Sequence, residues 1–98
     1  MITHVVAFRW KPDIPAGHIE AVKAQLLAFA SSLPEVRSYR CGSDVGASDM
    51  GNFDFAIAAE FDTIEDWGVY DTHPRHNEIR AGEVRPWIEE RAAVQFES

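Results

Sequence analysis

The sequence contains little of what marks several large classes of protein. Cys41 is its one cysteine, which excludes an internal disulfide framework and a zinc centre built from cysteine thiolates. No apolar run approaches the roughly 20 residues that a membrane-spanning helix needs. The N-terminal segment lacks the basic head and the small-residue cleavage site of a secretory signal. We therefore expect a cytoplasmic protein that does not cross a membrane.

Basic residues are scarce as well. Nine Lys and Arg residues stand against 16 Asp and Glu residues, which gives a formal net charge of −7. Such a chain repels polyanions, and no basic patch is interleaved with aromatic residues, so we expect no nucleic-acid partner. The sequence also has no phosphate-binding glycine loop and no nucleophile elbow. These absences argue against nucleotide use and acyl-enzyme chemistry.

The apolar residues that are present alternate along three segments, as expected for strands with one buried face. These segments are residues 2–10, 53–61 and 91–97, and residues 36–45 form a fourth, less regular candidate. His4 lies on the apolar face of the first segment. We therefore expect its imidazole to point towards the helices.

Apolar spacings of three and four predict the helices. The first is expected to open near Asp13, as a candidate cap, and to end by about Leu33, because the following proline disfavours helical geometry. Thr63 is predicted to cap a second, short helix. Pro74 suits the first position of a third helix after a break in the chain, and Pro86 should kink or divide that helix.

The resulting order is strand, helix, strand, strand, helix pair, strand. It predicts an α+β fold, a ferredoxin-like βαββαβ antiparallel sheet with the helices on one face, formed by residues 1–98 as a single domain. The opposite face still carries Val5, Ala7, Ala56 and Ala58, where a solvated sheet face would carry polar residues. A second copy of the sheet is the simplest cover. We therefore predict a homodimer whose two sheets face each other as a barrel.

Residues 70–76 gather several side chains that can handle protons. His76 could act as a general base, because neutral imidazole titrates near pH 6.5. Tyr70 could donate a hydrogen bond to an oxygen that gains charge in a transition state. Together they suit proton abstraction next to a carbonyl group. The alternative is that Tyr70 packs in the core and His76 is a surface residue of a first helical turn.

His73 has two interpretations, as part of a ligand site or as a cap or turn residue before Pro74. The spacing of His73 and His76 would allow both to bind one metal ion on a helix. However, no third ligand is identifiable, and zinc sites usually have three or four. We therefore expect neither a metal site nor a cofactor.

Motifs in a fixed order along nearly the whole chain resemble the stress-responsive A/B barrel family, often called Dabb, of dimeric α+β barrels. They are the opening strand 2–8 with His4, the turn 33–36, the strand 53–61 leading to Thr63, the segment of Tyr70 with residues 73–76, and the closing residues 85–87.

The resemblance implies a pocket between the sheet and the helices. In the cyclase-like members of the family a tyrosine and a histidine, which fall at Tyr70 and His76, carry out the proton chemistry. The strand-one histidine, here His4, lines the cavity. The expected substrate-binding residues are His4, Val6, Phe8, Val22, Leu26, His73, Ile79 and Trp87.

The main hypothesis is a homodimeric barrel that binds a mostly apolar small molecule. It would act as a cofactor-free cyclase or lyase on a polyketide-like or other apolar carbonyl substrate. One alternative is a non-catalytic, stress-responsive ligand-binding protein. Another is a haem- or oxygen-handling monooxygenase-like barrel with His4 or His76 as an iron ligand.

Overall fold

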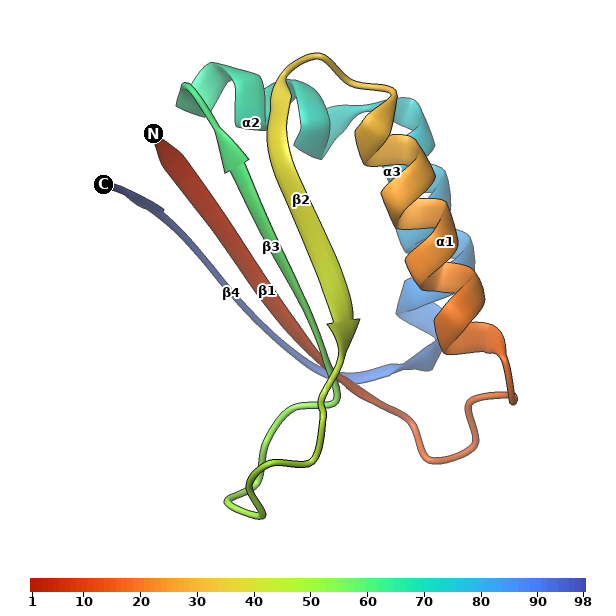
Figure 1. Cartoon of the computed structure of the whole chain (residues 1–98). Helices are drawn as coiled ribbons and strands as arrows, with labels where there is room; N and C mark the ends of the chain where they lie inside the picture. Colours follow the sequence, from red (N-terminus) through yellow and green to blue (C-terminus); the bar gives the residue numbers. More distant parts are fainter.

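The computed structural model describes all 98 residues. The chain forms four strands and several helical segments (Figure 1). In order they are β1 (Ile2–Trp10), α1 (His18–Ser31), β2 (Val36–Ser43), β3 (Phe55–Phe61), α2 (Ile64–Thr72), α3 (Pro74–Ile79), the π-helical segment η1 (Arg80–Val84), the 3₁₀ turn η2 (Arg85–Trp87) and β4 (Ile88–Glu97).

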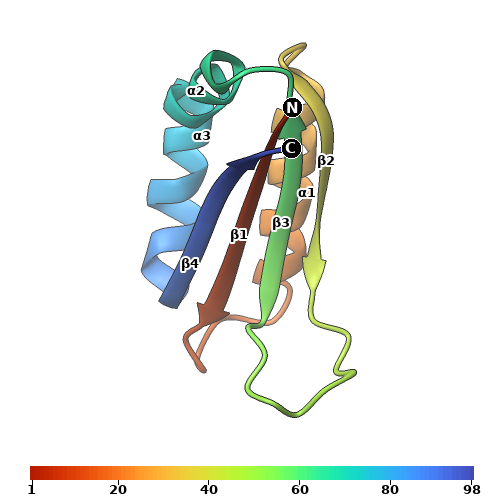
Figure 2. The same ribbon diagram turned by 90° about the vertical axis from the view of Figure 1, so that its left-hand side faces the viewer.

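The strands form one antiparallel sheet in the order β2-β3-β1-β4. All the helical segments cover the same face of this sheet (Figure 1), and the opposite face is bare (Figure 2). Helix α1 lies behind β3 and β2, whereas α2 and α3 lie towards β4. This is the ferredoxin-like α+β fold, and the prediction of its βαββαβ order and one-sided helix layer is confirmed.

The core lies between the sheet and the helices. Alternate residues of β1 and β3 are buried there, as the alternation predicts, and α1 contributes Val22, Leu26 and Phe29. In β1 the buried residues include His4, at 4% exposure, so the expectation that His4 points towards the helices is confirmed. An imidazole on an otherwise apolar face needs hydrogen-bond partners, because unpaired buried polar groups are costly.

Helix α1 starts later than predicted. Asp13 does not cap it, because a turn closed by the bond from the Ile14 amide to the Lys11 carbonyl occupies this part of the chain. The cap residue is Gly17, whose φ of 82° lies in the left-handed region that glycine adopts without strain. The helix therefore begins at His18.

Three strand boundaries also differ from prediction. β2 ends at Ser43 and β3 begins at Phe55, whereas β4 begins at Ile88, three residues before the predicted start. The early start of β4 follows from its pairing, because Ile88 stands opposite Trp10 beyond a bulge in the β1–β4 ladder. Apolar residues just before position 91 fit the spacing of a helix as well as the alternation of a strand, and local periodicity does not separate the two.

The helix pair forms as predicted. Thr63 caps α2, with its hydroxyl accepting from the Asp66 amide at 3.1 Å, and Pro74 occupies the first turn of α3. The division expected near Pro86 is present in a different form. The helix widens into η1 at Arg80 and then tightens into η2, which contains Pro86.

The uncovered sheet face carries apolar side chains from several strands. Ala92, Val94 and Phe96 of β4 stand opposite Ala7, Val5 and Thr3 of β1, so they share this face. Val94 is 53% exposed and Phe96 47% exposed. None of the helices is both long and apolar enough to span a membrane.

Candidate functional site

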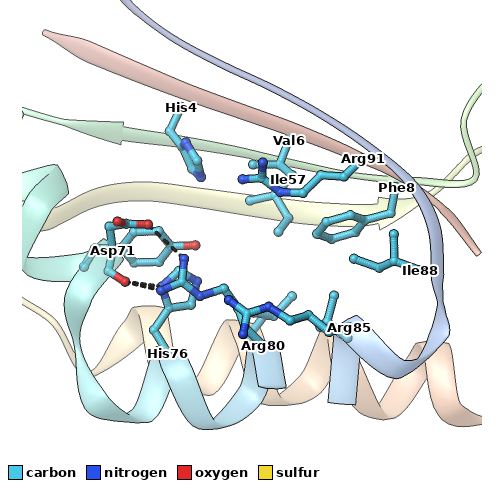
Figure 3. Close-up of a pocket in the computed structure, with 13 residues that line it drawn as sticks. His4, Val6, Phe8, Ile57, Asp71, His76, Arg80, Arg85, Ile88 and Arg91 are labelled. Carbon is cyan, nitrogen blue, oxygen red and sulfur yellow. Dashed lines mark hydrogen bonds and ion pairs between the residues drawn. The ribbon is translucent and has the colours of Figure 1, made fainter. Parts of the chain in front are cut away.

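A cavity of about 330 Å³ lies between the sheet and the α2–α3–η1 side of the helix layer. This volume is at the lower end of the range of roughly 300 to 1,000 Å³ found for small-molecule sites. Figure 3 shows side chains of the sheet facing those of the helical segments across this space. The apolar part of the wall consists of Val6, Phe8, Leu26, Ile57, Val84 and Ile88.

His4 enters the polar part of the wall from β1. Its Nδ1 receives two hydrogen bonds, from Gln95 Nε2 at 2.9 Å and from Trp67 Nε1 at 3.3 Å. Burial lowers the pKa of His4 to about 4, and the nearby Arg91 adds to this shift, so the ring is neutral at pH 7. Because Nδ1 accepts, the single proton must sit on Nε2. His4 is therefore a hydrogen-bond donor at that atom.

His76 reaches the cavity from α3 with the opposite tautomer. Its Nδ1 lies 3.1 Å from the Asp71 carbonyl oxygen, which can only accept, so Nδ1 carries the proton. Burial, followed by the charge of Arg80, lowers the pKa of His76 to about 4, and the ring is neutral at pH 7. Nε2 then holds a lone pair and has no partner in the protein. This atom can accept a proton.

Tyr70 packs between these rings and the core. Its ring centroid lies 4.3 Å from that of His76 and 5.7 Å from that of His4, and the side chain is 1% exposed. Its hydroxyl is 3.2 Å from the hydroxyl of Tyr39 on β2. Burial raises the pKa of Tyr70 to about 12, against the effect of this hydrogen bond. Tyr70 therefore stays protonated, and if Tyr39 donates to it, its own proton is free for a ligand.

Arg80, the first residue of η1, also lines the cavity. Its guanidinium holds the Asp71 carboxylate at 2.9 Å and also donates to the Asp71 carbonyl and to Asn77 Oδ1. π-Helical segments within helices are frequent at functional sites, because the extra residue shifts the side chains that follow. Here Arg80, Val84 and Arg85 all line the cavity.

The structure brings together six of the residues expected at the site from the sequence. His4, Val6, Phe8, Leu26, Tyr70 and His76 all line one cavity. The interpretation of His76 as a first-turn surface residue is wrong, since its side chain is buried at 5% exposure. The ring is held there by stacking on Phe29 at 5.5 Å.

Four other expected residues do not line this cavity. Val22 and Ile79 are completely buried in the core, where neighbouring side chains fill the space around them. Trp87 is half-buried and packs edge-on against His18. His73 caps α3, accepting from the Arg75 amide at 3.0 Å, in agreement with its interpretation as a cap.

Several functional candidates were missed in the sequence. Arg80, Arg85 and Arg91 line the cavity, while Tyr39 and Gln95 contact its rings. Only the alternation of residues along β4 could have pointed to two of these residues. Arg91 and Gln95 alternate with the apolar residues of β4, so the two share one face of the strand. Arg91 stands opposite Phe8 of β1, which is buried, so this face points towards the cavity.

No group of three or more His, Cys, Asp or Glu side chains is arranged to hold a metal ion. His73 and His76 each have one ring nitrogen engaged with the backbone of the α2–α3 region. What the cavity offers is a proton acceptor, His76 Nε2, together with two donors, His4 Nε2 and the Tyr70 hydroxyl. This set can remove a proton from carbon and stabilise the negative charge that forms on a neighbouring oxygen.

Comparisons with solved structures agree with this fold. A dimeric ferredoxin-like protein of unknown function from Thermobifida fusca YX is 33% identical, with a TM-score of 0.89 over 99% of this chain and 90% of that one. A dimeric protein of unknown function from Bacteroides fragilis NCTC 9343 is 26% identical, with a TM-score of 0.77 over 99% and 95%.

The hydroxynitrile lyase of Passiflora edulis shares the fold at 21% identity, with a TM-score of 0.83 over 97% of this chain and 90% of that one. No curated protein matches the sequence. Residues 2–98 match the stress responsive A/B barrel domain family. With this match over nearly the whole length, the chain belongs to the stress responsive A/B barrel domain (Dabb) family.

Proposed function

We propose that the chain forms a homodimeric barrel whose cavity binds a small carbonyl compound and moves a proton on it without a cofactor, as a lyase or cyclase. His76 would be the general base, and His4 and Tyr70 would donate to the substrate oxygen. The observation that carries this proposal is the opposite tautomers of the two imidazoles, one an acceptor and one a donor, in the same cavity.

The proposed step is an enolisation. His76 Nε2 takes a proton from the carbon next to the carbonyl group, the electron pair of the C–H bond forms a C=C bond, and the carbonyl oxygen becomes negative. Hydrogen bonds from His4 Nε2 and the Tyr70 hydroxyl stabilise this oxygen. The enolate carbon can then attack a second carbonyl of the same molecule, and the alkoxide that forms recovers the proton from His76. Read in reverse, the same sequence is a lyase reaction.

The low pKa of His76 narrows the class of substrate. At pH 7 the ring is fully in its base form, but a base of this pKa is weak. It suits carbon acids that are already activated, such as a carbon between two carbonyl groups. A polyketide-like substrate has such carbons, and the apolar wall would hold the rest of its chain.

The homodimer proposal rests on the uncovered sheet face. Val94 and Phe96 are exposed there beside the alanines of β1 and β3, and burying apolar area is the main driving force for such association. The relatives from Thermobifida fusca YX and Bacteroides fragilis are described as dimeric. The organisation of residues 1–98 as one domain and the cytoplasmic location remain predictions.

Deuterium exchange tests the chemistry. Ethyl 3-oxo-5-phenylpentanoate in D₂O at pH 6 would be followed by NMR, and the protein should accelerate exchange at the carbon between the carbonyl groups. His76→Gln should lower this acceleration by about 10² or more, the usual contribution of a general base. His18→Gln removes an imidazole outside the cavity, and this variant should accelerate the exchange as the wild type does. Equal rates for the wild type and His76→Gln would refute the base assignment.

The same experiment separates the non-catalytic alternative. A ligand-binding protein with this cavity would bind the ester, seen as shifts of the Tyr70 and His76 resonances, without accelerating its exchange. The haem-binding alternative is tested by haem titration, in which His4 or His76 would ligate the iron.

A further inference from the structure

The charge of the cavity wall is opposite to the charge of the chain. Three of the nine basic residues line the cavity, namely Arg80, Arg85 and Arg91, but Asp71 is the one lining residue among 16 acidic ones. The difference, three positive charges minus one negative charge, leaves the wall at +2 when both histidines are neutral. If charged residues were placed at random, a chain of net charge −7 would be expected to give the wall a negative charge.

The charges come from two sides of the cavity. Arg91 extends from β4, and Arg80 and Arg85 extend from the helical segments opposite (Figure 3). The carboxylate of Asp71 forms an ion pair with Arg80, at 2.9 Å. Neither Arg85 nor Arg91 belongs to any of the ion pairs of the protein. Both are exposed residues of the cavity wall, so they lie where the cavity opens.

Arg80 has a further donor available. Its terminal nitrogens are engaged, but its Nε is buried without a hydrogen-bond partner. Buried polar groups of native proteins normally have partners, so an unpaired donor beside a cavity indicates a missing acceptor. A carboxylate has the planar geometry and the acceptor capacity that guanidinium groups match.

We propose that the ligand of this cavity is an amphipathic carboxylate, with its anionic end held by Arg91, Arg85 and the free Nε of Arg80 and its apolar end against Val6, Phe8 and Leu26. This inference deepens the proposed function, on which it rests for the reacting carbonyl group. The substrate would then be a carbonyl compound that also bears a carboxylate.

The position of the arginines has a consequence for the base. Arg80 is a cause of the low pKa of His76, and Arg91 is a cause of the low pKa of His4. The groups that face His76 are Arg80 and Asp71 from the helical side and His4 from β1. A bound carboxylate would offset the positive charge and raise the pKa of His76, which makes it a stronger base only when the ligand is present.

Binding of two matched probes tests the proposal. 4-Phenylbutanoate is anionic and 4-phenylbutanamide is its neutral analogue, and both affinities would be measured by isothermal titration at pH 7. The carboxylate should bind about tenfold or more tightly than the amide, because charge-assisted hydrogen bonds are the stronger ones. Arg91→Gln should remove most of this difference and leave the affinity for the amide unchanged.

Arg75→Gln is the matched control, since Arg75 is an exposed arginine of α3 outside the cavity, and it should behave as wild type. Arg85→Gln provides a second variant at the rim, should Arg91→Gln perturb β4. Equal affinities for the two probes, no binding of either, or an equal loss for both in Arg91→Gln would overturn the proposal. Carboxylate-selective binding without deuterium exchange of 4,6-dioxoheptanoate, an activated diketone that bears a carboxylate, would uphold it and count against the proposed catalysis instead.

Discussion

Gln95 Nε2 and His4 Nδ1 lie 2.9 Å apart, although the two residues are 91 positions apart in the sequence. The two residues stand directly opposite each other in the β1–β4 ladder, and Trp67 donates to the same nitrogen. An amide nitrogen can only donate, so this pair fixes the tautomer of His4 and with it the donor that faces the cavity.

The first prediction concerns this tautomer. In the wild type at pH 7, ¹⁵N chemical shifts should report His4 protonated at Nε2. Gln95→Glu places a carboxylate at Nδ1, which should draw a proton to that atom and raise the pKa of His4. Gln95→Leu removes the donor without adding charge and serves as the control. A His4 proton at Nδ1 in the wild type would contradict the proposed donor role.

The second prediction is a pH dependence of stability. The pKa of both His4 and His76 is about 4 in the folded protein, below the value of about 6.5 in an unfolded chain. Between these values the unfolded state binds more protons, so stability is full above about pH 6.5 and is lost as the pH falls towards 4. The loss should be on the order of 3 kcal/mol for each imidazole.

Urea unfolding at several pH values between 7 and 4 measures this loss. His76→Gln should make the free energy of unfolding depend less steeply on pH in this window, because the contribution of the His76 imidazole is removed. If the His76→Gln and wild-type curves ran parallel across the window, the buried, neutral state of His76 would be wrong.

The third prediction separates the two tyrosines. Tyr70→Phe removes the donor at the cavity and should reduce deuterium exchange by about 10² or more, as for the loss of an oxyanion donor. Tyr39→Phe removes only the hydroxyl that bonds to Tyr70, so its effect should be smaller. A larger loss in Tyr39→Phe than in Tyr70→Phe would reverse the assignment of the donor.

The fourth prediction concerns the sheet face. Two chains of 11.0 kDa should sediment together as a dimer of 22.0 kDa at micromolar concentration. Val94→Lys puts a charge among the apolar residues of the uncovered face and should give the monomer, because burying an unpaired charge is costly. Val45→Lys, in the exposed β2–β3 loop, should remain dimeric. An 11.0 kDa wild-type monomer would refute the barrel.

The sequence predicted the elements well where the pattern was local. The alternation of β1 and β3 and the spacing in α1 follow from which side chains can be buried along a single segment. The start of α1 was missed because Asp13 is an ordinary cap in sequence terms, whereas the chain turns there and uses Gly17. The start of β4 was missed because Ile88 fits a helix or a strand equally well.

The candidate site was predictable in part. Tyr70, His76 and His4 carried a signal through their chemistry and through the resemblance to the family. The sequence could not distinguish Val22 and Ile79, which are core residues, from residues that line the cavity. A buried apolar position has the same sequence pattern whether its neighbour is another side chain or an empty space. Arg91 looked like any surface arginine of a strand.

By itself, then, the sequence determined the secondary structure, the ferredoxin-like order and the excess of apolar residues on a second sheet face. These properties depend on the period of side chains along single segments. The tertiary structure alone decided which imidazole donates and which accepts, and that three arginines line one cavity in an acidic chain. Those properties depend on Gln95, Trp67, Arg80 and Arg91 coming together with β1 and α3, and such contacts between distant segments leave no periodic trace in the sequence.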